Sequence, residues 1–138
     1  MAEKMKLLQD RMNQAILREL RNNGRISWQN LGRRVHLSGQ AVAERVRQLQ
    51  AQGIITGFSI KESRTRHFIT VIMQHTRFAH FESWLGQHPN IESVDKTSGD
   101  GCYLIVYATD DNAVLDEFLT ELLQHGSYRL SSSVRRIL

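Results

Sequence analysis

Three short stretches of helically spaced apolar residues follow one another within the first 53 residues, and this feature constrains the fold more than any other. The first stretch covers residues 10–22 and ends at Asn23-Gly24, since glycine readily adopts the left-handed turn that follows a helix. Ser27 and Ser38 stand where N-caps belong, which predicts helices over residues 28–35 and 39–52. The apolar residues on the inward faces are Met12, Ile16, Leu17, Leu20, Leu31, Val35, Val42, Val46 and Leu49.

A short helix, a tight turn and a longer helix in this order are typical of a helix-turn-helix. Gly32 is small where the two helices must approach closely, which supports this prediction. With its apolar residues inward, the third helix turns Gln40, Glu44 and Arg47 outward, with Ala43 beside them. Glutamine pairs with adenine, glutamate accepts from the cytosine amino group and arginine pairs with guanine, so these side chains are the predicted base readers.

Small and basic residues around these positions complete the predicted DNA surface. Gly39 and Ala43 would let the start of the helix lie close to the groove floor. Arg45 lies nearer the packed edge, so we expect it to hold a phosphate, as would the start of the second helix and its arginines. The full predicted set is Ser27, Trp28, Gln29, Arg33, Arg34, Ser38, Gly39, Gln40, Ala43, Glu44, Arg45 and Arg47.

The distribution of charge favours a polyanionic partner for the first half of the chain. Residues 1–66 carry thirteen Lys and Arg against five Asp and Glu, a net charge of +8, whereas residues 67–138 carry five against nine, a net charge of −4. Such polarity suggests that one half meets nucleic acid and the other has a different task. A three-helix bundle used for protein contacts would carry the same residues on solvated faces, so this alternative stays open.

From residue 54 onward the sequence changes to the alternating and β-branched patterns of strands. A strand is predicted over residues 54–60, followed by a polar linker. After the linker, the predicted order is β-α-β-β-α-β, the ferredoxin-like arrangement, with strands at 67–75, 91–97, 102–109 and 128–138 and helices from 78 and from 110. The expected fold class is α+β, with a helix-turn-helix domain at residues 1–57, a linker at 58–66 and a ferredoxin-like domain at 67–138.

A ferredoxin-like sheet with both helices on one side leaves its other face bare. A domain of about seventy residues can hardly leave such a face in water. We therefore expect a homodimer, formed by meeting sheet faces or by paired edge strands. Its two-fold symmetry would suit a pseudo-palindromic DNA site.

The number and spacing of the cysteine and histidine residues predict no metal or cofactor site. Cys102 is the single cysteine, so no internal disulfide is possible, and no Cys/His set has zinc-site spacing. Four histidines fall within residues 67–88, but they lie too far apart on a strand, or on either side of a helix end, to share an ion. We expect these histidines at the surface or at an interface, and Cys102 as a small buried residue.

The chain has no apolar run close to the ~18–20 residues of a membrane helix. Its first eight residues have neither the apolar segment nor the cleavage site of a secretory signal. We expect a cytoplasmic protein with no membrane partner.

Residues 16–57 resemble the helix-turn-helix of the Lrp/AsnC, or feast/famine, family of transcriptional regulators. The similarity lies in G-R-I-S at residues 24–27, L-S at 37–38, R-V-x-x-L at 45–49 and G-I-I-T-G at 53–57. The resemblance extends from about Gln9 to Leu138. It implies a transcription factor that binds double-stranded DNA, whose second domain, called RAM, joins dimers into tetramers or octamers and senses amino acids or related metabolites.

The resemblance also implies an effector site at a turn between dimers, formed here by Gly99, Asp100, Gly101 and Cys102. Family members commonly have Gly-x-x-Asp at this turn, so a thiol replaces a carboxylate. A carboxylate accepts hydrogen bonds from a ligand ammonium and a thiol does so poorly, so the effector is an amino acid, a different small molecule or none. Asn13 also departs from the family, which usually has a second acid there.

Two other functions compete with the regulator. Sirohaem decarboxylases resemble the same family and use His and Arg in the same two-domain frame. The arginines around the third helix count against this alternative, because such an enzyme would not need them. A metabolite sensor that no longer binds DNA would keep the fold and act through protein contacts. We expect a regulator that is not an enzyme.

Overall fold

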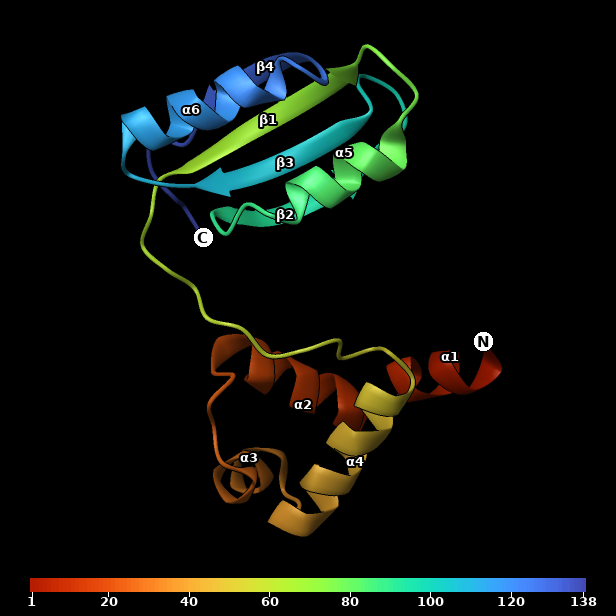
Figure 1. The fold of residues 1–138 in the computed structure, drawn as a ribbon. Coiled ribbons are helices and arrows are strands. Elements are labelled where there is room, and N and C mark those ends of the chain that lie inside the picture. Colours follow the sequence, from red (N-terminus) through yellow and green to blue (C-terminus); the bar gives the residue numbers. More distant parts are fainter. The chain divides into compact units, whose positions relative to one another are not determined.

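The computed structural model describes all of residues 1–138 and divides into two compact units, Met1–Lys61 and Glu62–Leu138 (Figure 1). The first unit is helical and the second is a sheet with helices, which confirms the predicted α+β class. None of the helices combines the length and the hydropathy needed to cross a membrane.

The helical unit contains α1 (Ala2–Gln9), α2 (Arg11–Asn22), α3 (Trp28–Val35) and α4 (Gly39–Ala51). The last three confirm the three predicted helices. Both serine caps form, because Ser27 Oγ accepts from the Asn30 amide and Ser38 Oγ accepts from the Ala41 amide, each at 3.1 Å. The buried core consists of Ile16, Leu31, Val35, Val42, Val46 and Leu49, all of which lie on the predicted inward faces.

Helix α1 was not predicted, because it has no buried residue and little apolar periodicity. Tertiary hydrogen bonds hold its C-terminal end instead. The Asn13 side-chain amide donates to the Leu7 carbonyl oxygen at 3.1 Å, and the Gln14 amide donates to that of Leu8 at 3.0 Å. Such contacts leave no pattern in the sequence.

The strand predicted over residues 54–60 is wrong for this chain. Ile54 and Ile55 follow α4 directly, and both of their amides donate to the Leu49 carbonyl, at 2.9 and 3.1 Å. The two isoleucines pack on the helical core, whereas Phe58 and Ile60 are exposed. A strand requires a neighbour that pairs with its backbone, and this segment has none within the chain.

The second unit contains β1 (Arg66–Met73), α5 (Phe78–Leu85), β2 (Ile91–Lys96), β3 (Tyr103–Ala108), α6 (Asn112–Leu122) and β4 (Gly126–Ser132). The strands form one antiparallel sheet in the order β2-β3-β1-β4, which confirms the ferredoxin-like prediction. The last strand stops at Ser132 and not at residue 138, because the β1 strand with which it pairs begins at Arg66.

The two faces of this sheet differ. Ile69, Val71 and Ile105 pack into a core with Phe81 of α5 and Phe118 of α6, so both helices cover one face (Figure 1). The alternate residues point to the opposite face, which neither α5 nor α6 covers. That face presents Phe68, Thr70, Ile72, Leu104 and Val106.

Candidate nucleic-acid interface

The turn between α3 and α4 is as tight as the sequence predicts. His36 adopts a left-handed conformation with φ 62°, and the Leu37 amide donates to the Gly32 carbonyl at 2.8 Å. A Cβ at Gly32 would lie 2.4 Å from the Leu37 carbonyl oxygen. The close approach predicted at Gly32 is therefore confirmed, and the two helices are held at a fixed angle.

The outward face of α4 carries the predicted base readers. Gln40, Glu44 and Arg47 are exposed, while Val42 and the other apolar residues of the helix are buried. Arg47 forms an ion pair with Glu44 one turn before it, and both side chains are more than half exposed, at 67% and 57%. Exposed pairs of this kind contribute little free energy, so the guanidinium can exchange its partner for a base or a phosphate.

The start of α3 flanks this face. Trp28, Gln29, Arg33 and Arg34 are exposed, and Arg34 donates through Nε to Glu19 of α2 at 2.6 Å. Arg33 makes no ion pair, so its charge is available to a phosphate.

A close contact between α3 and α4 requires a residue without a side chain at Gly39. A Cβ there would lie 3.2 Å from the Gln29 amide nitrogen and 3.4 Å from the Trp28 carbonyl carbon. The absence of a side chain at Gly39 thus lets α4 pack on the first turn of α3, a reason that differs from the access to the groove floor expected from the sequence.

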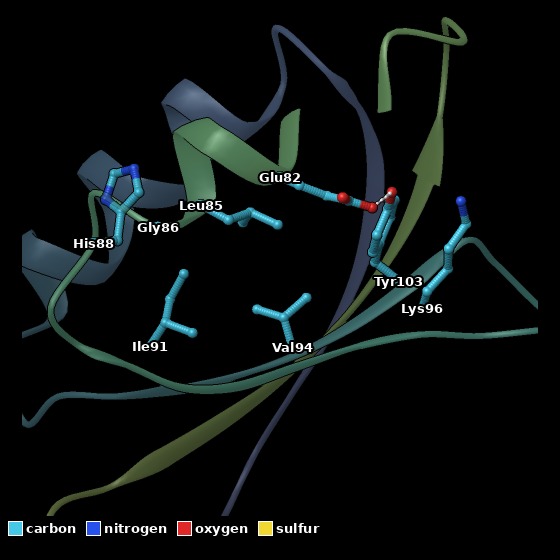
Figure 2. Close-up of a pocket in the computed structure, with 8 residues that line it drawn as sticks. All are labelled: Glu82, Leu85, Gly86, His88, Ile91, Val94, Lys96 and Tyr103. Atoms are coloured by element: carbon cyan, nitrogen blue, oxygen red, sulfur yellow. Dashed lines mark hydrogen bonds between the residues drawn. The ribbon is translucent and has the colours of Figure 1, made fainter. Parts of the chain in front are cut away.

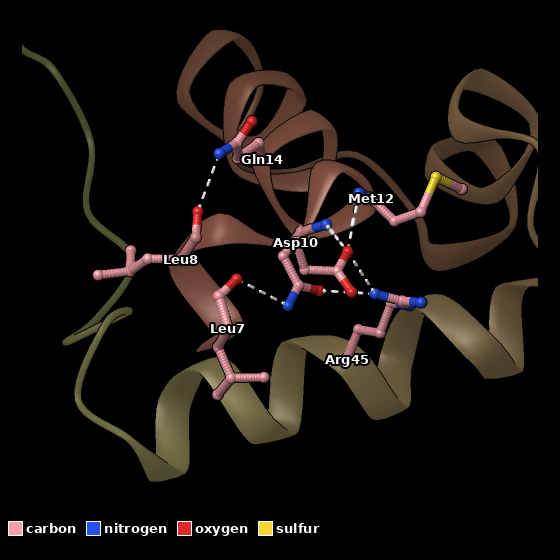
Figure 3. Close-up of polar contacts among 7 residues, drawn as sticks. Leu7, Leu8, Asp10, Met12, Gln14 and Arg45 are labelled. Carbon is pink, nitrogen blue, oxygen red and sulfur yellow. Dashed lines mark hydrogen bonds and ion pairs between the residues drawn. The ribbon is translucent and has the colours of Figure 1, made fainter. Parts of the chain in front are cut away.

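Arg45 is held inside the helical unit. Its Nη1 donates to Asp10 Oδ1 at 2.9 Å and to Asn13 Oδ1 at 3.1 Å, which joins α4 to the start of α2 (Figure 3). Asp10 also caps α2, and the backbone amide of Asn13, together with Arg45, lowers the pKa of the Asp10 carboxyl. A phosphate contact by Arg45 remains a prediction, and it would compete with these two bonds.

Asn13 positions Arg45, a role that the spacing of residues along the sequence does not predict. Asn13 is 1% exposed and its side chain has partners at both ends, because its oxygen accepts from Arg45 and its nitrogen donates to the Leu7 carbonyl. An aspartate could make the first bond but not the second. The signal available in the sequence was a polar residue three positions before Ile16, on the apolar face of α2.

Replacing Arg45 by methionine is expected to lower the free energy of unfolding by about 1–2 kcal/mol, because buried Asn13 loses its donor. Urea unfolding measures this loss, and Arg33→Met is the matched control, with unchanged stability. If Arg45 also contacts a phosphate, as predicted, Arg45→Met should reduce the salt slope of DNA binding by about one. An unchanged slope would leave Arg45 with the structural role alone.

Two family models match the chain. The AsnC-type helix-turn-helix domain matches residues 10–50, and the Lrp/AsnC ligand binding domain matches residues 66–135. The chain belongs to the Lrp/AsnC family. The HTH-type transcriptional regulator LrpA of Bacillus subtilis is 33% identical over 129 residues, which cover 88% of this chain and 95% of the relative. This Lrp/AsnC protein is accordingly a DNA-binding transcriptional regulator.

Solved structures of Lrp/AsnC proteins share the fold. LrpC of B. subtilis superposes with a TM-score of 0.83 at 24% identity and covers 93% of this chain and 96% of its own. The regulator NMB0573 of Neisseria meningitidis, solved as a complex with L-Met, superposes with a TM-score of 0.79 at 23% identity and covers 94% and 92%.

The turn that the Lrp/AsnC resemblance assigns to the effector joins β2 to β3. Gly99 and Gly101 have φ of 101° and 95°, which side chains rarely adopt, and a Cβ at Gly101 would lie 2.6 Å from Thr70 Cγ2. The Cys102 amide donates to the Val71 carbonyl at 2.7 Å, so the turn is fixed to β1. Asp100 is exposed and Cys102 is half-buried. An effector site at these four residues remains a prediction.

A cleft of about 480 Å³ opens elsewhere in the same domain of this Lrp/AsnC protein, beside α5 and β2 (Figure 2). Glu82 Oε1 accepts from the Tyr103 hydroxyl at 2.7 Å, and burial, together with this carboxylate, raises the pKa of Tyr103 to about 12. The residues that line the cleft come from α5 and the turn after it, from β2 and from β3, and the packing of the helix beside the two strands brings them together. They are Glu82, Leu85, Gly86, His88, Ile91, Val94, Lys96 and Tyr103.

The histidines of the RAM-type domain are more buried than expected. His67 is 3% exposed and hydrogen-bonds to the Thr109 carbonyl and to Ser132, and His125 is 6% exposed. The prediction that the four histidines of residues 67–88 lie at the surface or at an interface is therefore wrong for His67. The His125 ring lies 4.7 Å from that of Trp84 and 5.7 Å from that of His75, and no set of three acidic, His or Cys side chains could hold a metal ion.

Acid is expected to destabilise this domain through His125. Burial, and then the nearby His75, His80 and Arg77, lower the pKa of His125 below its usual 6.5. The unfolded chain then binds the proton more readily, so stability falls as the pH drops through about 6.5 and levels off below the folded-state pKa.

Thermal unfolding at about pH 7.5 and about pH 5.5 measures this loss. His125→Phe keeps an aromatic ring in the core but cannot titrate, so its midpoint should change less between the two pH values. An equal change in both proteins would exclude His125 as the cause.

Proposed function

We propose that this regulator reads a pseudo-palindromic operator as a homodimer, with the outward face of α4 in the major groove. The exposure of Gln40, Glu44 and Arg47 above a buried apolar face carries this proposal. These side chains, with Ala43, would contact bases. The residues that would contact phosphates are Ser27, Trp28, Gln29, Arg33, Arg34, Ser38, Gly39 and Arg45.

We assign a separate role to each part of the chain. Residues 1–57 would bind DNA, residues 58–66 would act as a linker, and residues 67–138 would assemble the dimer and bind an effector. We infer that the uncovered sheet face forms the dimer contact, because Phe68, Ile72 and Leu104 lie on it. Dimers of this kind could join further into tetramers or octamers in the cytoplasm.

An amino acid or a related metabolite is the proposed effector. One structural neighbour was solved as a complex with L-Met. The effector would bind at the turn Gly99–Cys102 and favour one assembly over another, which requires different affinities for the two states. Since the named relatives are transcriptional regulators, we propose that the protein is not an enzyme of the sirohaem-decarboxylase type.

Fluorescence anisotropy tests DNA reading with two duplexes, one from the upstream region of the protein's own gene and one of scrambled sequence. The titration is repeated over a range of salt. Tighter binding to the first duplex, weakening steeply as salt rises, is the expected result. Equally weak binding to both, and to fragments selected from a random library, would favour a sensor that does not bind DNA.

Ile72→Lys is expected to weaken the dimer by about 2–5 kcal/mol, because a charge would be buried without a partner at the sheet face. Sedimentation velocity over a range of protein concentrations measures this change. Thr120→Lys, on the exposed side of α6, is the control and should sediment like the parent. If Ile72→Lys leaves the dimer unaffected, the dimer contact is formed by the edge strands and not by the sheet face.

A further inference from the structure

Four arginines line a small pocket at one end of the sheet. At this end β1 begins, and β3 and β4 end (Figure 1). The volume of the pocket is about 240 Å³, below the ~300–1,000 Å³ typical of sites for drug-sized ligands. The effector turn contributes no residue to it. The lining residues that carry the argument are Arg64, Arg66, Arg135, Arg136, Glu62 and Asp110.

The backbone around this arginine pocket is fixed. The Ser133 amide donates to the Arg66 carbonyl at 2.8 Å, and the Thr109 amide donates to the Thr65 carbonyl at 2.9 Å. Asp110 Oδ1 accepts from both the amide and the hydroxyl of Thr65, at 2.9 and 2.8 Å. The three segments that line the pocket are thus tied together before any ligand binds, which lowers the cost of ordering a site.

Arg64 is anchored by three hydrogen bonds, and one of its remaining donors is buried without a partner. Its Nη1 donates to Asn90 Oδ1 at 3.2 Å and to the Ala108 carbonyl at 3.1 Å, and its Nη2 donates to Glu62 at 3.0 Å. Its Nε is buried and has no hydrogen-bond partner. Buried donors are rarely left unpaired, so this group suggests an acceptor that the polypeptide does not supply.

The charge of the pocket is positive although the domain around it is acidic. Glu62 is paired with Arg64, and Asp110 stays ionised because the hydrogen bonds from Thr65 lower its pKa. Arg66, Arg135 and Arg136 form no ion pair, and only Arg136 has a side-chain hydrogen bond, from Nε to the Leu138 carbonyl at 2.7 Å. Four arginines against two carboxylates leave two positive charges for an anion.

We propose that this arginine pocket binds a small anion with a phosphoryl group, either free phosphate or the phosphate of a small metabolite. Guanidinium forks match the oxygens of a phosphate in pairs, and arginine is the residue that proteins use for such recognition. The concave shape and small volume favour a compact anion over the backbone of a duplex. The site would give the regulator a second input, chemically distinct from an amino acid.

Isothermal titration of the full chain, without DNA, tests this proposal with inorganic phosphate and with pyrophosphate. Sodium chloride at matched ionic strength is the reference. We expect saturable binding, together with a shift of the Arg64 Nε–H resonance in a ¹⁵N NMR spectrum. The double variant Arg135→Ala, Arg136→Ala should bind at least ~10-fold more weakly, because each lost charged hydrogen bond costs about that factor.

Arg77→Ala is the matched control, since Arg77 is exposed in the same domain but does not line the pocket. It should bind phosphate like the parent, and all variants should keep the thermal midpoint of the parent, because the substituted side chains are exposed. If chloride abolishes phosphate binding, or if the double variant binds phosphate as the parent does, the ligand is an adventitious ion only. Either result would overturn the proposal. Loss of DNA affinity in the double variant without phosphate binding would also overturn it, by assigning these arginines to DNA.

Discussion

A Gly32→Ala variant is expected to lose about 3 kcal/mol of unfolding free energy in the helix-turn-helix unit, the upper part of the usual range for overpacking. The new Cβ would lie 2.4 Å from the Leu37 carbonyl oxygen and 3.1 Å from the Ser38 carbonyl carbon. Both are backbone atoms of the turn, so no flexible side chain can move aside. The turn must open, and α4 must then move away from α3.

The loss should also appear in DNA binding. Helix α4 carries the proposed base contacts and α3 carries proposed phosphate contacts. If the angle between the two helices changes, the side chains of one helix no longer reach the DNA when those of the other are bound. Urea unfolding and anisotropy on the operator measure the two effects. Gly24→Ala is the matched control, because its Cβ would meet only the Leu20 carbonyl oxygen, at 3.7 Å. Equal stability of the two variants would contradict the tight turn.

The helix-turn-helix was predictable because its determinants are local. Ser27 and Ser38 cap the helices that they precede, and the apolar residues of α4 recur at the helical period. The ferredoxin-like order was predictable for a similar reason, since β1 and β3 are rich in β-branched and aromatic residues. Residues 54–60 show the limit of such patterns, because their composition suits a strand but no partner strand is present in the chain.

The candidate sites were predictable only in part. The outward direction of Gln40 and Arg47 follows from the helical period, so their exposure was foreseen. The bonds of Arg45 to Asp10 and Asn13 link positions more than thirty residues apart, and spacing along the sequence does not encode such contacts. The cleft beside α5 and the arginine pocket likewise arise where separate segments of the chain meet.

Arg47→Ala is expected to weaken binding to the operator by about 1–3 kcal/mol, or roughly 5- to 150-fold, if Arg47 pairs with a guanine. The Arg47 side chain is 67% exposed and its ion-pair partner, Glu44, is also exposed, so the stability of the domain should not change. Anisotropy on the operator and on a scrambled duplex measures the effect. The loss should fall on the operator alone, whereas Arg33→Ala should weaken both duplexes and reduce the salt slope by about one.

The ion pair between Arg47 and Glu44 complicates this prediction, and a double-mutant cycle resolves it. Removing Arg47 leaves the Glu44 carboxylate without its partner next to a polyanion, so part of the loss would come from repulsion. Glu44→Gln alone should then cost little or bind more tightly, and the double variant should recover part of the affinity lost by Arg47→Ala. If the double variant instead loses affinity additively, Glu44 itself contacts a base, and cytosine, which donates from its amino group, is the base to substitute next.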